Sequence, residues 1–315
     1  MRYFIRRLLS TLLVLAGVSV LIFVLVRLLP GNIVDIIAGT EGELSHAQRL
    51  AVLQEFGLNQ PLPVQYGLWV WNLLHGNFGY SYRTDQPVAG LLLSRLPITI
   101  ELALLSVVAS ALIGMLLGIV ASVSSSGKVK VVAQIVGLLG LSIPSFWLAV
   151  VLIIFASFTF HWLPPLIFVQ IWQNPWLNLQ QMFLPVLSLA LGLAAVVLRM
   201  TRSSMLEVLG EDYVKVAWAK GLPRRAVVLR HALRNALIPV VTVLGLQTGY
   251  LLGGVVITEQ IFGLPGLGWT LLNGVYQRDY PVVEGSVMLF SVTFEVIKLA
   301  VDLLYTALDP RIRYE

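Results

Sequence analysis

Residues 211–239 read EDYVKVAWAKGLPRRAVVLRHALRNALIP, a charged stretch that lies between two apolar runs long enough to cross a bilayer. It carries six basic residues against two acidic ones, and its centre is the turn Lys220-Gly221-Leu222-Pro223. A polar connection between long apolar segments predicts an all-α membrane protein, because a helix satisfies every backbone group of its own segment within lipid.

The composition indicates the same class. Hydrophobic residues make up 57% of the 315 residues, charged residues make up 12%, and the mean hydropathy is +0.86. These charges are too few to coat a soluble protein of this length. The chain has no cysteine, so disulfides and thiolate metal sites are excluded.

The apolar runs predict six transmembrane helices in a polytopic protein. The first run follows Arg2, Arg6 and Arg7 and has no small-residue cleavage site, so we interpret it as a retained span and not as a secretory signal. The fourth run continues past Arg199, whose side chain can reach the interface. The predicted spans are residues 8–26, 102–123, 131–158, 183–203, 236–257 and 287–307.

Six spans place both termini on one side, and the positive-inside rule identifies that side. The face with the termini would hold fifteen Lys and Arg residues, whereas the opposite face would hold five: Arg27, Arg49, Arg83, Arg95 and Arg278. We therefore predict a multi-pass protein of the cell inner membrane, with cytoplasmic termini and a cytoplasmic loop at 124–130. The connection at 204–235 is then cytoplasmic too.

The predicted organisation has four parts. Residues 1–29 hold the N-terminal end and the first span, residues 30–96 form an outer loop region, residues 97–307 form the membrane core, and residues 308–315 are a cytoplasmic tail. In the outer region, Ser45-His46-Ala47-Gln48 is a capping box for a helix that ends at Gly57. The run VQYGLWVWNLL at 64–74 predicts a second helix, whose Trp69 and Trp71 suit a membrane interface or a docking partner.

The charged connection predicts a helix, a tight glycine turn and a second helix. Asp212 can cap a first helix over 213–220, Gly221 can end it in the left-handed conformation, and Pro223 suits the start of the next helix. Tyr213, Val216, Ala217 and Lys220 share one stripe, and the small side chains of Ala217 and Ala219 allow another backbone to approach. The pattern indicates insertion into a groove of a cytoplasmic partner. The alternative is a basic loop that binds anionic lipid headgroups.

Two runs, DYVKVAWAKGL at 212–222 and HALRNALIPVVTVLGLQ at 231–247, resemble the signature loop of ABC importer permeases in the peptide and nickel branch. Seven further runs resemble family landmarks in family order: LLPGN, GLNQPLPVQY, GNFGYSY, SIPSFWLA, FGLPGLGW, RDYPVV and LDPRIRY. The chain departs from the general importer pattern at Lys215-Val216-Ala217, where that pattern has Glu-Ala-Ala, and the peptide branch shares this relaxed form. It also has Gly31-Asn32-Ile33 where peptide permeases usually have Gly-Asp-Pro.

The resemblance implies a type I ABC importer permease with six spans and cytoplasmic coupling helices. It implies a second homologous permease in a heterodimer, two ATPase subunits that hold ATP and Mg, and a solute-binding protein outside. It also implies di- or oligopeptides as substrate, with nickel chelates and glutathione left open. The residues it assigns to ATPase coupling are Glu211, Asp212, Tyr213, Lys215, Val216, Ala217, Ala219, Lys220, Gly221, Arg224 and His231.

The sixth span carries Glu295, Lys298 and Asp302, which share one helical face at spacings of three and four. A charge in mid-bilayer is costly, so this face should point inward. It is either a self-satisfied structural network or a contact with the substrate pathway or the partner permease. Glu101 and Glu259 are candidates for an outer gate.

The sequence lacks the motifs of catalysis. Its one Gly-Lys pair, Gly127-Lys128, has no upstream glycine loop, so we expect no ATP hydrolysis by this chain. The four histidines have no paired ligand spacing, so we expect neither a metal site nor a bound cofactor. The membrane flanks explain the basic charge, which points to lipid as a partner and not to nucleic acid. A secondary transporter or channel without ATPase partners is the alternative from another class.

Overall fold

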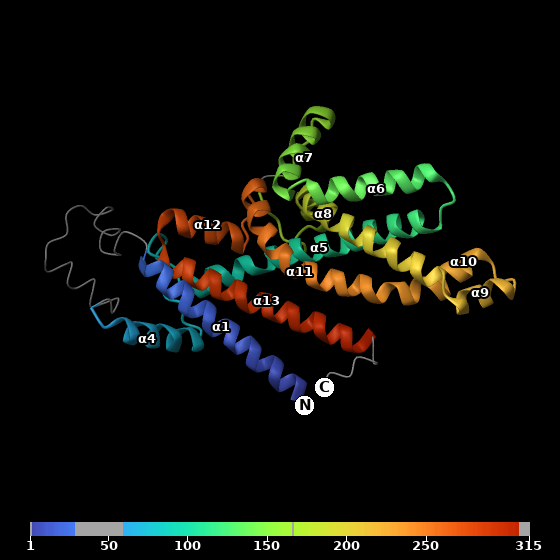
Figure 1. Ribbon diagram of the computed structural model, residues 1–315. Coiled ribbons are helices and arrows are strands. Elements are labelled where there is room, and N and C mark those ends of the chain that lie inside the picture. The colour runs from blue at the N-terminus through green and yellow to red at the C-terminus, as the bar shows by residue number, and fades with distance from the viewer. Residues whose placement is uncertain (1, 29–58, 166, 309–315) are drawn as a thin grey trace. The chain divides into compact units, whose positions relative to one another are not determined.

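The computed structural model describes residues 2–28, 59–165 and 167–308 (Figure 1). The predicted helix at 45–57 and the predicted tail, apart from Leu308, lie outside these residues. The described elements are α1 (Arg2–Leu28), α4 (Leu62–Leu74), α5 (Val88–Val123), α6 (Gly127–Ser142), α7 (Ser145–Phe160), α8 (Pro175–Leu209), α9 (Asp212–Ala219), α10 (Arg224–Ala226), the π-helix η1 (Val227–Ala232), α11 (Leu233–Phe262), α12 (Leu267–Gln277) and α13 (Tyr280–Leu308).

Four helical stretches of the described chain are long and apolar enough to cross a membrane: Arg7–Leu28, Val88–Val123, Pro175–Leu209 and Arg224–Gly249. The number rises to six if each of two bent helix pairs, α6 with α7 and the end of α11 with α12, is one span. Five of the predicted spans coincide with these stretches or with the first bent pair. The sixth, α13, is long but carries Glu284, Glu295, Lys298 and Asp302, and it is not among them.

The third predicted span is not one helix. The sequence predicted one span over 131–158, but in the structure α6 and α7 meet at an angle of 108°. Ile143 and Pro144 between them are extended, with ψ angles of 119° and 138°. Proline has no N–H to donate and disfavours helical geometry in the residue before it, so the chain breaks at this point.

The chain divides into two compact units, Met1–Pro97 with Gly266–Glu295 and Ile98–Pro265 with Val296–Tyr314. In the first unit, one buried cluster joins Val88 and Leu92 of α5 to Leu267 and Val282. A second cluster joins the inner face of α1 to the start of α13, through Ile22, Val26 and Val283. Helix α4 was predicted correctly, and its Trp69 packs against Phe23 of α1.

Polar contacts tie the same elements together. Arg27 of α1 donates to Glu284 of α13 at 2.8 Å, and its guanidinium lies 3.3 Å from the centre of the Phe23 ring. The Ser81 hydroxyl donates to the buried carboxylate of Asp279, which also accepts from the Tyr82 amide at 3.3 Å. The runs GNFGYSY and RDYPVV, far apart in the chain, therefore meet within this unit.

Helix α8 is the centre of the second unit, where α6, α7 and α11 pack on it. Helix α5 approaches it through two glycines at spacing four. A Cβ atom on Gly114 would lie 2.5 Å from Val197 Cβ and 2.7 Å from the Ala194 carbonyl oxygen, and one on Gly118 would lie 2.6 Å from Thr201 Cβ. Only glycine allows this approach, which is typical of membrane helix pairs.

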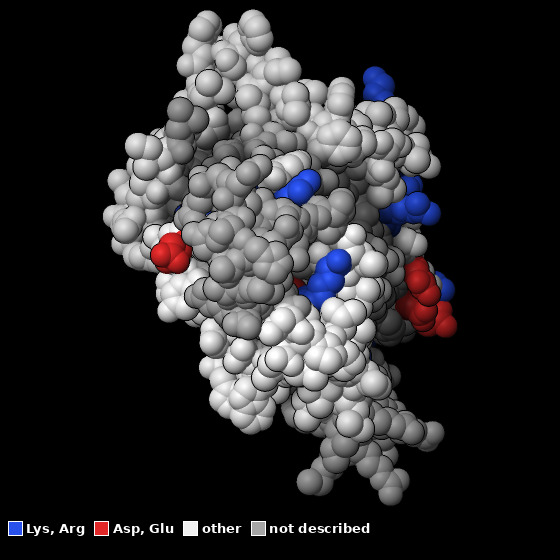
Figure 2. All heavy atoms as spheres, turned by 90° about the vertical axis from the view of Figure 1, so that its left-hand side faces the viewer, with Lys and Arg blue, Asp and Glu red and all other residues white. Residues whose placement is uncertain are grey.

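Large apolar side chains are exposed along many of the long helices, among them Leu13 of α1, Leu116 of α5, Val132 of α6 and Phe155 of α7. The face of the molecule in Figure 2 shows few charged side chains among the described residues. A surface of this kind requires an apolar solvent, so the exposed apolar residues belong to a protein embedded in a membrane.

Candidate functional site

The charged connection folds as a helical hairpin, residues 211–232. Figure 1 shows α9 and α10 at the end of the second unit, where α8 ends and the segment leading to α11 begins. The predicted order of helix, glycine turn and helix is confirmed. Gly221 has a φ of +72°, the left-handed conformation that glycine adopts at little cost.

The turn is a Schellman motif. The Gly221 amide donates to the Trp218 carbonyl at 2.9 Å, and the Leu222 amide donates to the Ala217 carbonyl at 3.4 Å. Together these bonds satisfy two carbonyls that the last turn of α9 would otherwise leave open. The reversal is therefore hydrogen-bonded and defined in geometry.

The predicted cap at the start of α9 is wrong. Glu211 occupies the cap position without a side-chain bond to the helix, and Asp212 is already the first helical residue. The Asp212 carboxylate instead accepts from Lys215 Nζ at 2.8 Å, on an exposed face. An acid in the first turn still favours the helix through its dipole, although an exposed pair of this kind contributes little.

The hairpin has an inner and an outer face. Val214 and Ala217 are buried against Val227 of η1, with Val208 and Leu209 of α8 packed beside them. The predicted stripe is therefore divided, because Ala217 faces inward. The outer face carries side chains that are exposed in this chain: Tyr213, Lys215, Val216, Trp218, Ala219, Lys220, Leu222, Arg224 and Leu229.

Three apolar members of that outer face, Trp218, Leu222 and Leu229, were missed in the sequence. Each is more than a third exposed, as are Tyr213 and Val216. The spacing of three between Val214 and Ala217, together with the apolar start of the second helix, was the signal that could have identified the inner face. An exposed cluster of large apolar residues rimmed by basic ones indicates a protein contact surface.

Hydrogen bonds anchor the hairpin to its unit. Asn235 Nδ2 of α11 donates to the Tyr213 hydroxyl at 2.7 Å, and that hydroxyl donates to the His231 carbonyl at 3.4 Å. The Arg224 guanidinium donates to the Val123 carbonyl at the end of α5. The His231 side chain is half-buried. Movement of the hairpin would thus be passed to both α5 and α11.

The second arm of the hairpin continues without a break into α11. Helices α10, η1 and α11 follow one another from Arg224 to Phe262, and η1 is a π segment of the kind that often marks functional positions. At the far end of α11, Glu259 is fully buried and accepts from Thr99 Oγ1 of α5 at 2.6 Å. A single helical rod therefore joins the hairpin to a buried carboxylate.

The charged face of α13 is only partly described. Glu295 is buried and its Oε2 accepts from Thr11 Oγ1 of α1 at 2.9 Å, so its predicted inward orientation is confirmed. Lys298 is half-buried, and the side chain of Asp302 lies outside the described residues. Among the residues that the structure describes, His, Asp and Glu side chains form no group of three that could hold a metal ion.

These features define the class of protein: an integral membrane protein whose helical run α10, η1 and α11 begins at an exposed, basic and apolar hairpin. The family described as "Binding-protein-dependent transport system inner membrane component" matches residues 114–314, and its N-terminal counterpart matches residues 1–103. The chain belongs to this family and is a permease of a binding-protein-dependent ABC importer.

Relatives match along the whole chain. The glutathione transport system permease protein GsiC of Salmonella choleraesuis is 42% identical over 316 residues, which cover 100% of each chain. A protein of Brucella abortus that carries the name of a peptide transport system permease is 40% identical over 311 residues, 99% of this chain and 98% of its own.

Solved structures share the fold. Inward facing conformations of the MetNI methionine ABC transporter align with a TM-score of 0.55 at 21% identity, over 70% of this chain and 96% of the matched chain. An amino acid ABC transporter aligns with a TM-score of 0.51 at 18% identity, over 71% and 94%. The fold is thus that of an ABC importer permease, as predicted.

Proposed function

We propose that this permease forms half of a transmembrane pathway for di- or oligopeptides, with glutathione as a substrate of the same chemical class. The observation that supports the substrate is the identity of about two residues in five, along the entire chain, to permeases named for peptide and glutathione transport. A second, homologous permease supplies the other half of the pathway, and a solute-binding protein delivers the substrate from outside.

The hairpin is the contact for an ATPase subunit. Its inner face, Val214 and Ala217, is occupied by the chain's own core, whereas Val216, Trp218 and Leu222 have exposed apolar area. Basic residues flank these side chains, in keeping with a cytoplasmic location for the hairpin and for both termini. ATP and Mg are held and hydrolysed by the ATPase subunits, and this permease contributes no catalytic residue and binds no cofactor itself.

Coupling follows from the connections of the hairpin. Closure of two ATPase subunits draws the two hairpins of a permease pair together, and each rod of α10, η1 and α11 carries that displacement into its bundle. The buried contact of Glu259 with Thr99 at the far end of the rod makes α5 move with α11. Alternating access then results from a population shift between two arrangements of the bundles.

The decisive experiment replaces an outer-face residue without disturbing the inner face. Val216 is 53% exposed, so Val216→Asp should leave membrane insertion and expression unchanged. The variant should lose copurifying ATPase subunits and ATP-driven peptide uptake, because a charge is buried in the contact. Val216→Leu is the matched control and should retain both.

Two outcomes would count against the proposal. If Val216→Asp kept its copurifying ATPase subunits and full peptide uptake, the hairpin would not be the coupling contact. Uptake of a nickel chelate but of no dipeptide and no glutathione, by the complex reconstituted with its binding protein, would refute the substrate class while leaving the coupling role standing.

A further inference from the structure

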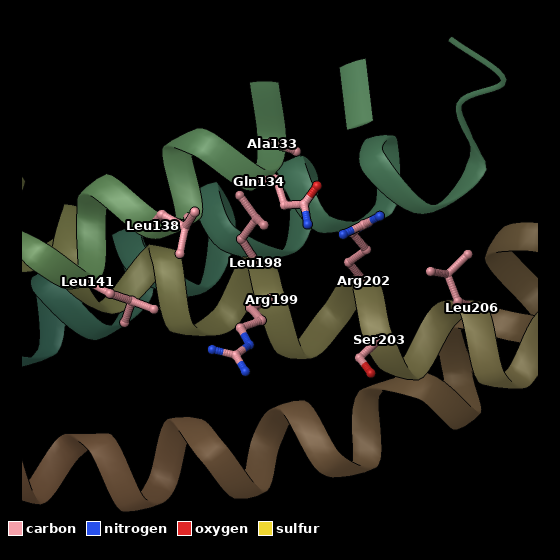
Figure 3. A pocket seen from close by; sticks show the side chains of 10 residues that line it. Ala133, Gln134, Leu138, Leu141, Leu198, Arg199, Arg202, Ser203 and Leu206 are labelled. Carbon is pink, nitrogen blue, oxygen red and sulfur yellow. The ribbon is translucent and has the colours of Figure 1, made fainter. Parts of the chain in front are cut away.

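A pocket of about 480 Å³ lies between α6 and α8 in the second unit (Figure 3). Its walls are apolar along Leu138, Leu141 and Leu198, and they become polar at Gln134, Arg199 and Arg202. Figure 3 shows Arg202 extending from α8 toward Gln134 of α6, whereas Arg199 extends from α8 in the other direction. The pocket thus combines an apolar channel with a cationic end.

Among the described residues, no carboxylate neutralises the cationic end of the pocket. The Arg202 Nε atom is buried and has no hydrogen-bond partner, and among the described residues neither Arg199 nor Arg202 has a carboxylate within ion-pair distance. A buried guanidinium N–H is costly to leave without an acceptor, and Arg202 brings a positive charge to this end of the pocket. Both facts point to an anionic ligand at this end of the pocket.

The place of the pocket in the fold indicates which anion. Arg199 and Arg202 lie near the end of α8, and the hairpin packs on that end of the second unit. The first turn of α6, a helix that packs on α8, carries the basic residues Lys128 and Lys130. Beyond the pocket, α6 exposes a continuous run of apolar side chains, Val131, Val132, Ile135, Val136 and Leu139, as a helix does when it faces lipid tails.

A ligand that fits must be anionic at one end and apolar along its length. A peptide carboxylate satisfies only the first condition, because the remainder of a peptide carries backbone groups that Leu138 and Leu141 cannot hydrogen-bond. A phospholipid satisfies both. Basic pockets between membrane helices on the cytoplasmic side are a recurrent form of headgroup site.

We infer that this pocket binds one anionic phospholipid, whose phosphate contacts Arg202 and Gln134 and whose acyl chain lies along Leu138 and Leu141. The inference goes beyond the proposed function and does not depend on the substrate. The third span loses its helical continuity at Pro144, between α6 and α7. The lipid would bridge α6 to α8 just before that break.

Native mass spectrometry of the complete importer tests this, with phosphatidylglycerol or phosphatidylcholine vesicles as the lipid source. The wild type should retain phosphatidylglycerol in preference to phosphatidylcholine. Arg202→Gln should reduce that retention by about tenfold, the effect of losing one charge-assisted bond. Arg225→Gln is the matched control, since Arg225 is exposed on the hairpin outside the pocket and its loss removes the same charge.

A second variant distinguishes loss of the lipid site from a folding defect of Arg202→Gln. Ala133→Phe fills the pocket and keeps both guanidinium groups, so it should also lose the lipid if the apolar channel is part of the site. Equal retention of phosphatidylglycerol by wild type, Arg202→Gln and Ala133→Phe would overturn the inference.

Two further results would overturn it in favour of another ligand. Complete displacement of phosphatidylglycerol by millimolar inorganic phosphate would show a site for a soluble anion. Efficient cross-linking of Leu138→Cys to the second permease would show that protein, and not lipid, covers the pocket.

Discussion

Thr99 Oγ1 of α5 donates a hydrogen bond of 2.6 Å to Glu259 Oε1 at the end of α11, and both side chains are buried. The bond joins the helix that holds the hairpin's Arg224 contact to the helix that continues from the hairpin itself. Two routes from the hairpin, through α5 and through α11, therefore meet again at this pair.

Thr99→Val should lower the free energy of unfolding by about 1 kcal/mol, because the buried carboxylate loses a donor in an apolar setting. Thr248→Val is the matched control. Thr248 lies on α11 and donates only within its own helix, to Leu244, so its loss should cost less. Thermal unfolding of the two purified variants measures the difference, and equal midpoints would show that the bond contributes nothing.

Gly114→Ala should destabilise the second unit by about 1–3 kcal/mol, as overpacking does. The added methyl would meet both Val197 Cβ and the Ala194 carbonyl oxygen, and a backbone carbonyl cannot move aside. Gly90→Ala on the same helix has open space around it and should be neutral or stabilising by up to about 1 kcal/mol. Denaturation of both variants side by side makes the comparison, and a neutral Gly114→Ala would refute the close approach of α5 to α8.

The burial of Tyr82 predicts that the stability of the first unit depends on pH. Burial raises the pKa of its hydroxyl above the usual 10.0, and the charges of Glu284 and Asp279 raise this pKa further. The folded state then binds the proton more tightly than the unfolded state does. This contribution to stability is present below about pH 10 and is lost as the pH rises beyond that value.

The measurement is the unfolding midpoint of the wild type and of Tyr82→Phe between pH 8 and pH 11. The wild-type midpoint should fall more steeply at the alkaline end, because Phe has no proton to lose. Parallel curves would mean that Tyr82 titrates alike in the folded and unfolded states.

Substitution of Gly221 should uncouple transport from ATP hydrolysis. Its φ of +72° is accessible to Asn at modest cost but strained for a β-branched residue, and no neighbouring atom lies within 4 Å of an added Cβ. Gly221→Val should therefore distort the hairpin by backbone strain alone and reduce peptide uptake per ATP hydrolysed. Gly221→Asn should stay close to the wild type in the same reconstituted assay. Full coupling in Gly221→Val would show that the turn geometry is dispensable.

Much of the hairpin could be predicted from residue types, because its geometry is local. Gly221 and Pro223 act through their own backbone preferences, and these do not depend on distant contacts. The orientation of Ala217 could not be predicted in the same way. It depends on Val227 and on the end of α8, which only the folded chain brings beside it.

Two features of the membrane core show the same contrast. Hydropathy located the third span but not the size of its bend. Pro144 alone could not decide the bend, because prolines within α5, α8 and α11 leave those helices continuous. The close approach of α5 to α8 could not be predicted from glycine spacing alone, because several helices of this chain carry glycines. A Cβ on Gly253 of α11 would have nothing within 4 Å and one on Gly254 would lie 3.2 Å from Leu189, whereas Gly114 and Gly118 of α5 lie against α8 with no room for a Cβ.

By itself the sequence determined that this is a polytopic helical permease, that its basic connection forms a glycine-turned hairpin, and which family it belongs to, because apolar run length, charge and turn chemistry act locally. The tertiary structure alone decided which face of the hairpin is exposed, that Thr99 meets Glu259, and that Arg199 and Arg202 share a pocket with α6. Those relations join residues distant in the chain, and they follow from helix packing, which no local pattern encodes.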